Sequence, residues 1–151
     1  MKEICLTQGL ITLVDDEDYE YLSQWKWYPK KRGNTCYAWA SMDRKTILMH
    51  RFILDTPKGI FTDHIDFNGL NNQRNNLRFC TAIQNNAHRE KWGTKSKYKG
   101  VNPFGKRYRA QICIKGKPTH LGYFNTEEEA ALKYNEFAVI VQGEFAVLNV
   151  V

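Results

Sequence analysis

The sequence predicts an α+β fold built in two parts. Short segments rich in β-branched and aromatic residues alternate with turn signals over most of the chain, and two segments carry capping boxes that open helices. A polar, glycine-containing stretch at residues 90–96 separates the two parts. We therefore expect one domain over residues 1–92 and a second over residues 93–151, a division that a chain of 151 residues can accommodate.

The first domain is predicted to begin with strands. Three segments alternate apolar and polar residues or flank turn signals: residues 3–7, 10–14 and 35–40. Residues 15–28 start with acidic side chains and then place apolar residues at helical spacing, which predicts a short helix. The acidic side chains are typical of a solvated helix start, because the glycine and distal glutamate of a calcium loop are missing. Residues 47–54 are predicted to form a further strand.

The second domain is predicted to be a three-stranded antiparallel sheet packed on one helix. The strands are expected at residues 98–101, 107–115 and 119–124, with Gly116-Lys117 turning the last two into a hairpin. The helix should open at the capping box of Thr126 and Glu129 and stop at Gly143. Its apolar face is predicted to comprise Ala130, Ala131, Tyr134, Phe137, Ala138 and Val141.

Charge is distributed unevenly along the chain. The formal net charge is +6, and residues 89–117 carry ten basic side chains against Glu90 alone. Such a stretch, interleaved with aromatic residues, indicates a polyanionic partner, most simply nucleic acid; a solvated linker and hairpin is the alternative. No apolar run approaches the ~18–20 residues that span a bilayer, and no signal peptide is evident, so we expect a cytoplasmic protein without membrane contact. The four cysteines form no C-x-x-C pair, so we expect no structural zinc.

The densest chemistry lies between Asp63 and Arg89, in a segment rich in asparagine. Asp63, His64 and Asn85 suit phosphodiester hydrolysis, because a carboxylate and an amide oxygen can hold one Mg²⁺ or Mn²⁺ while a neutral imidazole deprotonates water. Neighbours on a regular strand point to opposite faces, so Asp63 and His64 can share a site only at a strand end or bulge. A hydrogen-bonded asparagine loop with an ordinary histidine is the alternative.

Residues 49–88, which contain the stretch DHIDFNGLNNQRNNLRFCTAIQNNAH, resemble the HNH endonucleases of the ββα-metal fold, especially the phage and intron-encoded homing group. The resemblance implies that His64 is the general base, that Asp63 and Asn85 bind the metal, and that Asn76 braces the loop and orients the base. His88 stands where many relatives have a further asparagine. His50 lies in the family's common MHR stretch and is expected to be structural or to contact phosphate.

Residues 96–149 resemble the plant Apetala-type or ethylene-response-factor DNA-binding domain. The resemblance implies that the sheet enters the major groove of double-stranded DNA and that the following positions bind DNA: Lys99, Lys106, Arg107, Arg109, Gln111, Lys117 and His120. Lys99 replaces a usual arginine and His120 a usual tryptophan, so the base preference of plant relatives does not transfer. From the residues alone, Arg107, Arg109 and Gln111 alternate onto one face of a strand, where they suit guanine and adenine edges.

The segment from Gly100 to Arg107 nearly matches a phosphate-binding P-loop. The Ser or Thr that would bind magnesium is replaced by Arg107, and a strand rather than a helix is expected to follow. We therefore expect no nucleotide cofactor.

Together these observations predict a site-selective, metal-dependent DNA endonuclease of the homing type, acting as a monomer that nicks one strand in a bacterial or phage-infected cell. A DNA-binding regulator with an idle nuclease centre is the main alternative. An RNA-processing nuclease is disfavoured, because A-form RNA hides the base edges that a sheet could reach in the major groove of DNA.

Overall fold

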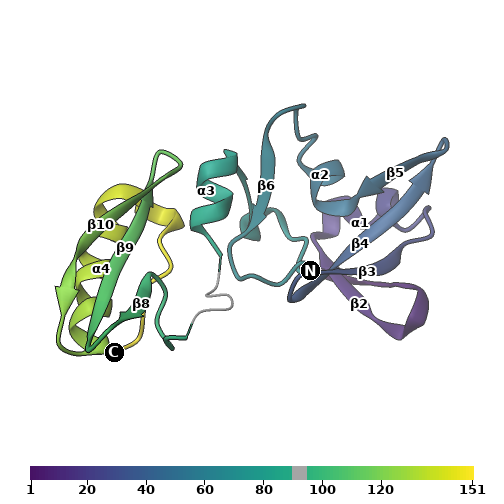
Figure 1. Cartoon of the computed structure of the whole chain (residues 1–151). Coiled ribbons are helices and arrows are strands. Elements are labelled where there is room, and N and C mark those ends of the chain that lie inside the picture. The colour runs from purple at the N-terminus through teal and green to yellow at the C-terminus, as the bar shows by residue number, and fades with distance from the viewer. Residues whose placement is uncertain (90–94) are drawn as a thin grey trace. The chain divides into compact units, whose positions relative to one another are not determined.

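The computed structural model describes residues 1–89 and 95–151, which form two compact units (Figure 1). Unit 1 is Met1–Thr81 and unit 2 is Ala82–Val151. The linker expected at residues 90–96 falls largely on residues 90–94, and these, like the expected domain boundary, lie outside the described residues. The boundary between the two units lies after Thr81, eleven residues before the domain boundary that the sequence predicted after residue 92. The helix that follows Thr81 therefore belongs to unit 2.

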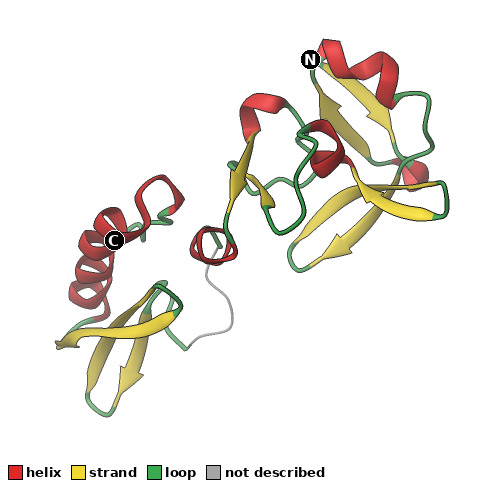
Figure 2. Cartoon of the chain, turned by 90° about the horizontal axis from the view of Figure 1, so that it is seen from above, coloured by secondary structure: helices red, strands yellow, loops and turns green. Residues whose placement is uncertain are grey.

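Unit 1 contains three small antiparallel sheets, two short α-helices and two 3₁₀ turns, Thr7–Gly9 and Arg74–Asn76 (Figure 2). The elements are β1 (Lys2–Cys5), β2 (Ile11–Val14), α1 (Asp16–Leu22), β3 (Tyr28–Arg32), β4 (Thr35–Met42), β5 (Lys45–Leu48), α2 (Met49–Ile53), β6 (Phe61–His64) and β7 (Leu77–Cys80). Strand β1 pairs with β2, β4 lies between β3 and β5, and β6 pairs with β7. The predicted N-terminal hairpin and the short helix after it are both present.

The core of unit 1 is formed around Trp27, whose side chain is almost fully buried with those of Leu22, Met49 and Val14. The indole Nε1 of Trp27 donates a 2.8 Å hydrogen bond to the carbonyl of Leu22, so the polar atom of this large side chain is satisfied inside the core. These contacts fix the end of α1 against β2 and α2.

The strand predicted over residues 47–54 is wrong. Strand β5 ends at Leu48, and the chain continues as helix α2. Met49, His50 and Ile53 are all buried. Ile53 lies four residues after Met49 and three after His50, so a helix turns all three toward one side, whereas a strand would turn Met49 and His50 to opposite faces. Packing of one face against the core therefore favours a helix over a strand at residues 49–53.

The acidic start of α1 is more than a solvated helix end. Arg74 places Nε and Nη2 at 2.8 and 2.7 Å from the carboxylate of Asp18, and it also pairs with Glu17. The backbone N–H of Arg74 donates to Asp15 at 2.7 Å. Asp15 and Asp18 thus tie the asparagine-rich loop to the N-terminal helix, a role that the sequence pattern did not predict.

Unit 2 consists of a three-stranded antiparallel sheet, one long helix and the short helix α3 (Ala82–Ala87). The strands are β8 (Val101–Phe104), β9 (Arg107–Ile114) and β10 (Lys117–Phe124), in the order β10-β9-β8, and α4 (Glu127–Gln142) packs on β9 and β10 (Figure 1). Val101, Ala110, Ala130, Ala131 and Tyr134 are buried between helix and sheet. The predicted arrangement of three strands on one helix is present.

Two features of the unit 2 sheet differ from the prediction. The first strand spans Val101–Phe104 rather than residues 98–101, because Gly100 has φ +75° and packs so closely under Tyr134 that a Cβ atom would clash with its ring. The β9–β10 turn is centred on Lys115 and Gly116, both with positive φ, one residue earlier than expected. Two such residues match the type I′ turn that suits the twist of a hairpin.

Helix α4 begins as predicted. The hydroxyl of Thr126 accepts from the backbone of Glu129, whose carboxylate accepts from the backbone of Thr126. Of the expected apolar face, the alanines and Tyr134 are buried and Phe137 packs at their edge, but Val141 is exposed. In the described parts of the chain, no helix has both the length and the apolar character needed to cross a bilayer.

Candidate active site and nucleic-acid interface

The β6–β7 ribbon positions Asp63 and His64. Asp63 lies opposite Arg78 in the antiparallel register, and His64 lies opposite Leu77. His64 is the last residue of β6, and the chain turns directly after it through Phe67, which has φ +63°. The strand end that a shared site requires is therefore present. Both side chains are buried, at 7% and 5% exposure, so the fold holds them in fixed orientations.

Asp63 is paired with Arg78 across the ribbon. Nε and Nη2 of Arg78 both lie 2.9 Å from the same carboxylate oxygen, Oδ2, and the two side chains are 13% and 8% exposed. The neighbouring Cys80 thiol is affected as well: burial, and then the charge of Asp63, raise its pKa to about 11. Cys80 is therefore a neutral thiol near pH 7 in the metal-free protein.

His64 is oriented by Asn72, a residue that the sequence did not single out. Nε2 of His64 lies 3.2 Å from Oδ1 of Asn72. The amide nitrogen of Asn72 donates to Oγ1 of Thr12 at 2.7 Å, and that hydroxyl donates to the carbonyl of Leu70 at 2.7 Å. This chain of donors fixes the Asn72 amide so that its oxygen faces His64. Neutral His64 must then carry its proton on Nε2 and present the lone pair on Nδ1.

Three aromatic rings cluster at the site. The ring of His50 meets that of His64 edge-on, with centroids 4.9 Å apart, and Tyr37 lies 5.4 and 5.7 Å from the two histidines. Nδ1 of His50 is buried without a hydrogen-bond partner. Burial, reinforced by the charges of His64 and Arg51, lowers the pKa of His50 to about 3. Burial also lowers the pKa of His64. The hydrogen bond with Asn72 and the charges of Asp66 and Asp63 raise this pKa, but the effect of burial is larger.

Asn76 braces the turn after His64. Its Oδ1 accepts from the backbone of Asp66 at 3.0 Å, and its amide nitrogen donates to the carboxylate of Asp66 at 2.9 Å and to the carbonyl of Asn71 at 2.8 Å. Burial opposes ionisation of Asp66, but hydrogen bonds from Asn71, Asn68 and Asn76 lower its pKa overall. The loop contacts expected of Asn76 are present, whereas contact with His64 is made by Asn72; the catalytic role of Asn76 stays a prediction.

A divalent cation at this site would depend mainly on oxygen ligands. Within residues 1–89 and 95–151, no three His, Cys, Asp or Glu side chains gather in a way that could hold a metal. A single carboxylate, helped by an amide oxygen, water and substrate phosphate, is nevertheless a donor set that suits Mg²⁺ or Mn²⁺. Asp63 is the residue predicted to supply that carboxylate. Asn85 is half-buried on α3 and belongs to unit 2, so its assignment as second ligand stays a prediction.

The outer face of the unit 2 sheet carries the predicted DNA-binding residues. Arg107, Arg109 and Gln111 alternate along β9, and His120 lies opposite Gln111 on β10. Lys106 and Lys117 are exposed at the two hairpin turns. The Nε atom of Arg109 is buried and has no hydrogen-bond partner.

Sequence reasoning missed an aromatic cluster on this face. Tyr123 lies opposite Arg109, and its ring centroid is 4.8 Å from that of Phe104 and 4.5 Å from that of His120. Phe104 and Tyr123 are 53% and 44% exposed. Regular alternation along β10 would have turned Tyr123 and His120 to opposite faces; a register shift between His120 and Gly122 brings them together, and Phe104 joins them because it lies opposite Arg107. The face therefore combines cationic, amide and aromatic groups.

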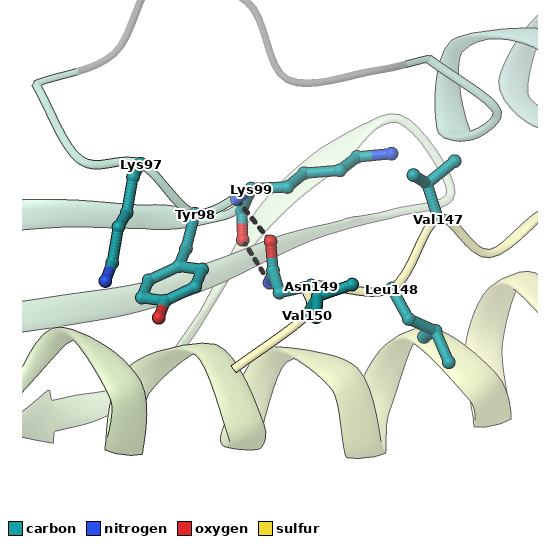
Figure 3. A pocket seen from close by; sticks show the side chains of 7 residues that line it. All are labelled: Lys97, Tyr98, Lys99, Val147, Leu148, Asn149 and Val150. Carbon is teal, nitrogen blue, oxygen red and sulfur yellow. Dashed lines mark hydrogen bonds between the residues drawn. The ribbon is translucent and has the colours of Figure 1, made fainter.

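Lys99 differs from the other predicted DNA-binding residues. Its ammonium group donates to the carbonyls of Ala87 and Arg89, at the end of α3, and burial lowers its pKa to about 8. Its backbone is held by the side chain of Asn149, which accepts from the N–H and donates to the carbonyl (Figure 3). In this structure Lys99 ties α3 to the rest of unit 2, and its assignment to DNA binding stays a prediction.

Two known proteins resemble the chain. It is 34% identical over 149 residues to an uncharacterized HNH endonuclease of Acanthamoeba polyphaga mimivirus, covering 94% of the chain and 76% of that protein. It is also 40% identical over 65 residues to a putative HNH homing endonuclease derived from the SPbeta prophage of Bacillus subtilis, covering 40% of the chain and 38% of that protein. No protein-family model and no solved structure matches. The near full-length similarity shows that the chain belongs to the HNH endonucleases.

Proposed function

We propose that this protein is a metal-dependent DNA endonuclease that hydrolyses a phosphodiester bond with His64 as general base. The observation that carries the proposal is the hydrogen bond from His64 Nε2–H to Asn72, because it leaves Nδ1 to accept a proton from water. His64 stands at the end of the strand that also holds Asp63, whose charge acts on the imidazole.

Asp63 is the proposed metal ligand, with Asn85 as the second on the family resemblance. A bound Mg²⁺ or Mn²⁺ would neutralise the charge that develops on the leaving oxygen. The chain's own residues supply the rest: Asn72 orients the base, and Asn76 holds the turn that follows it. One Asp63–His64 pair per chain supports cleavage of one strand by a monomer at each binding event.

Unit 2 is proposed to bind double-stranded DNA through the outer face of its sheet. Arginine and glutamine on one face of β9 suit base edges in the major groove, and the exposed lysines at the turns suit phosphates. The buried, unpartnered Nε of Arg109 supports a ligand on this face, since such a donor is costly to leave unmet. The Apetala-type resemblance and the homing role belong to this proposal; the prophage relative is itself named a putative homing endonuclease.

A DNA-binding regulator with an idle nuclease centre is the alternative. A plasmid-nicking assay with Mg²⁺, with Mn²⁺ and with a chelator separates the two functions. We expect metal-dependent nicking that falls about 10²–10⁴-fold in His64→Ala, with DNA affinity nearly unchanged. Asn75→Ala is the matched control, because Asn75 is an exposed residue of the same loop. Equal nicking by His64→Ala and the unmodified protein would exclude the proposed mechanism, and no nicking by any protein would favour the regulator.

A further inference from the structure

The carboxylate proposed to bind the metal already has a cationic partner. Nε of Arg78 donates a 2.9 Å hydrogen bond to Oδ2 of Asp63, and Nη2 lies 2.9 Å from the same oxygen within the ion pair. Strand pairing places the two residues directly opposite each other, and both side chains are largely buried. The pair is therefore built into the β6–β7 ribbon, unlike an exposed ion pair that solvent and salt would weaken.

This pairing changes the charge that a cation would meet. Asp63 and Arg78 together are neutral, so a divalent ion approaching Asp63 also approaches a fixed positive charge. Asp66 keeps its charge, but both of its carboxylate oxygens already accept hydrogen bonds within the turn, from Asn71, Asn76 and the backbone of Asn68. The protein alone thus offers a weak site for a divalent cation.

A DNA phosphate would remove this obstacle. A guanidinium group carries parallel N–H donors that match two phosphate oxygens, a better fit than the single oxygen Oδ2 that Arg78 contacts here. If the guanidinium moves to a phosphate, Arg78 no longer neutralises the negative charge of Asp63, at the moment when the phosphate also offers oxygen ligands.

We propose that Arg78 is a phosphate-binding residue that couples cation binding to DNA binding: it neutralises Asp63 in the free protein and moves to the phosphate of bound DNA. The inference rests on the proposed function, because it takes Asp63 as the metal ligand. It makes the cation and the DNA mutually dependent ligands, each strengthening the binding of the other.

The test is a Mn²⁺ titration followed by electron paramagnetic resonance, with the full chain alone and with a short mixed-sequence duplex that carries non-hydrolysable phosphorothioate linkages, at low salt. For the unmodified protein we expect the duplex to tighten Mn²⁺ binding by a factor within the usual range of about 5–150-fold for coupled ligands. In Arg78→Gln, Mn²⁺ binding by the free protein should tighten about tenfold, and the additional effect of DNA should largely disappear.

Arg74→Gln is the matched control. Arg74 lies four residues earlier, carries the same charge and pairs with Asp18 and Glu17 instead of Asp63. Its variant should behave as the unmodified protein in both titrations. Asp63→Asn should abolish the Mn²⁺ signal and so identify the site being measured.

The outcomes separate this inference from the proposed function. If Mn²⁺ binds at Asp63 but its affinity in folded Arg78→Gln is unchanged or weaker, the coupling role of Arg78 is wrong while the nuclease proposal stands. If no variant binds Mn²⁺ with or without DNA, the metal site itself is wrong. If Arg78→Gln fails to fold, Arg78→Lys is the deciding variant. Lysine keeps the positive charge but lacks the paired N–H donors of arginine, so the duplex should tighten Mn²⁺ binding less than it does in the unmodified protein. Equal tightening in the two proteins would overturn the inference.

Discussion

The imidazole of His64 is held by Asn72, with Nε2 3.2 Å from the amide oxygen. Asn72 is fully buried, and its amide nitrogen reaches back sixty residues to the hydroxyl of Thr12 on β2. The backbone N–H of Asn72 also donates to the carbonyl of Leu13. The N-terminal hairpin is therefore part of the support of the candidate base, although it carries none of the family's motif residues.

Asn72→Ala should lower both activity and stability. The substitution removes the acceptor of His64 and leaves the Thr12 hydroxyl with one partner fewer, at a cost of about 1–3 kcal/mol in the free energy of unfolding. The imidazole also loses the contact that selects its tautomer, so we expect nicking to slow about 10–100-fold in the folded variant. Single-turnover nicking and urea unfolding measure the two effects. Asn75→Ala should change neither, and full activity in Asn72→Ala would show that Asn72 does not orient the base.

Asn76→Ala should separate loop support from base orientation. Asn76 makes three hydrogen bonds within the turn after His64 and none with His64 that the structure shows. We expect a loss of about 1–3 kcal/mol in the free energy of unfolding and slower nicking, because a looser turn lets the base wander. Thermal melting and nicking rates check this. Unchanged turnover of the folded variant would assign Asn76 a purely structural role.

His50 should make the protein sensitive to mild acid. Its pKa is about 3 in the folded protein, against an ordinary value of 6.5. Between these values the unfolded chain binds a proton that the native state does not, so the free energy of unfolding falls as the pH falls. The pair of pKa values corresponds to a loss of about 2 kcal/mol between pH 7.5 and pH 5. Unfolding titrations at several pH values should show that the free energy of unfolding depends less on pH in His50→Phe, which keeps an aromatic ring. The same pH dependence in both proteins would show that His50 is not its source.

Lys99 and Lys117 should respond differently to substitution. Lys117→Gln removes an exposed cation at a hairpin turn, so the slope of log affinity against log salt should fall by about 0.9 if that lysine contacts a phosphate. Lys99→Gln should leave the slope unchanged and lower stability, because its ammonium group holds the end of α3. DNA-binding titrations at several salt concentrations, with thermal melts, distinguish the two. An equal reduction of the salt slope in Lys99→Gln and Lys117→Gln would show that Lys99 contacts DNA as well.

The sequence predicted those elements whose local signals agree with their packing. The capping box of Thr126 and Glu129 and the alternation of Arg107 to Gln111 fall into this class. It misassigned residues 49–53, where burial of Met49 and His50 on one face outweighs the strand-like pattern. Asn72 and Arg78 were not foreseen, because their importance comes from contacts with Thr12 and Asp63 that sequence spacing does not encode. The role of Lys99 was likewise set by its tertiary partners.

The bonds from Lys99 to the end of α3 bear on the exchange of DNA-reading modules between nucleases of this kind. A chimaera joined within residues 90–94 would separate α3 from the lysine that caps it. A junction at Thr81 and Ala82 would instead transfer α3, Lys99 and the sheet together, in agreement with the division of the chain into units. In an engineered hybrid joined there, the incoming helix must therefore supply an asparagine at the position of Asn85, because Asn85 is the proposed second metal ligand beside Asp63.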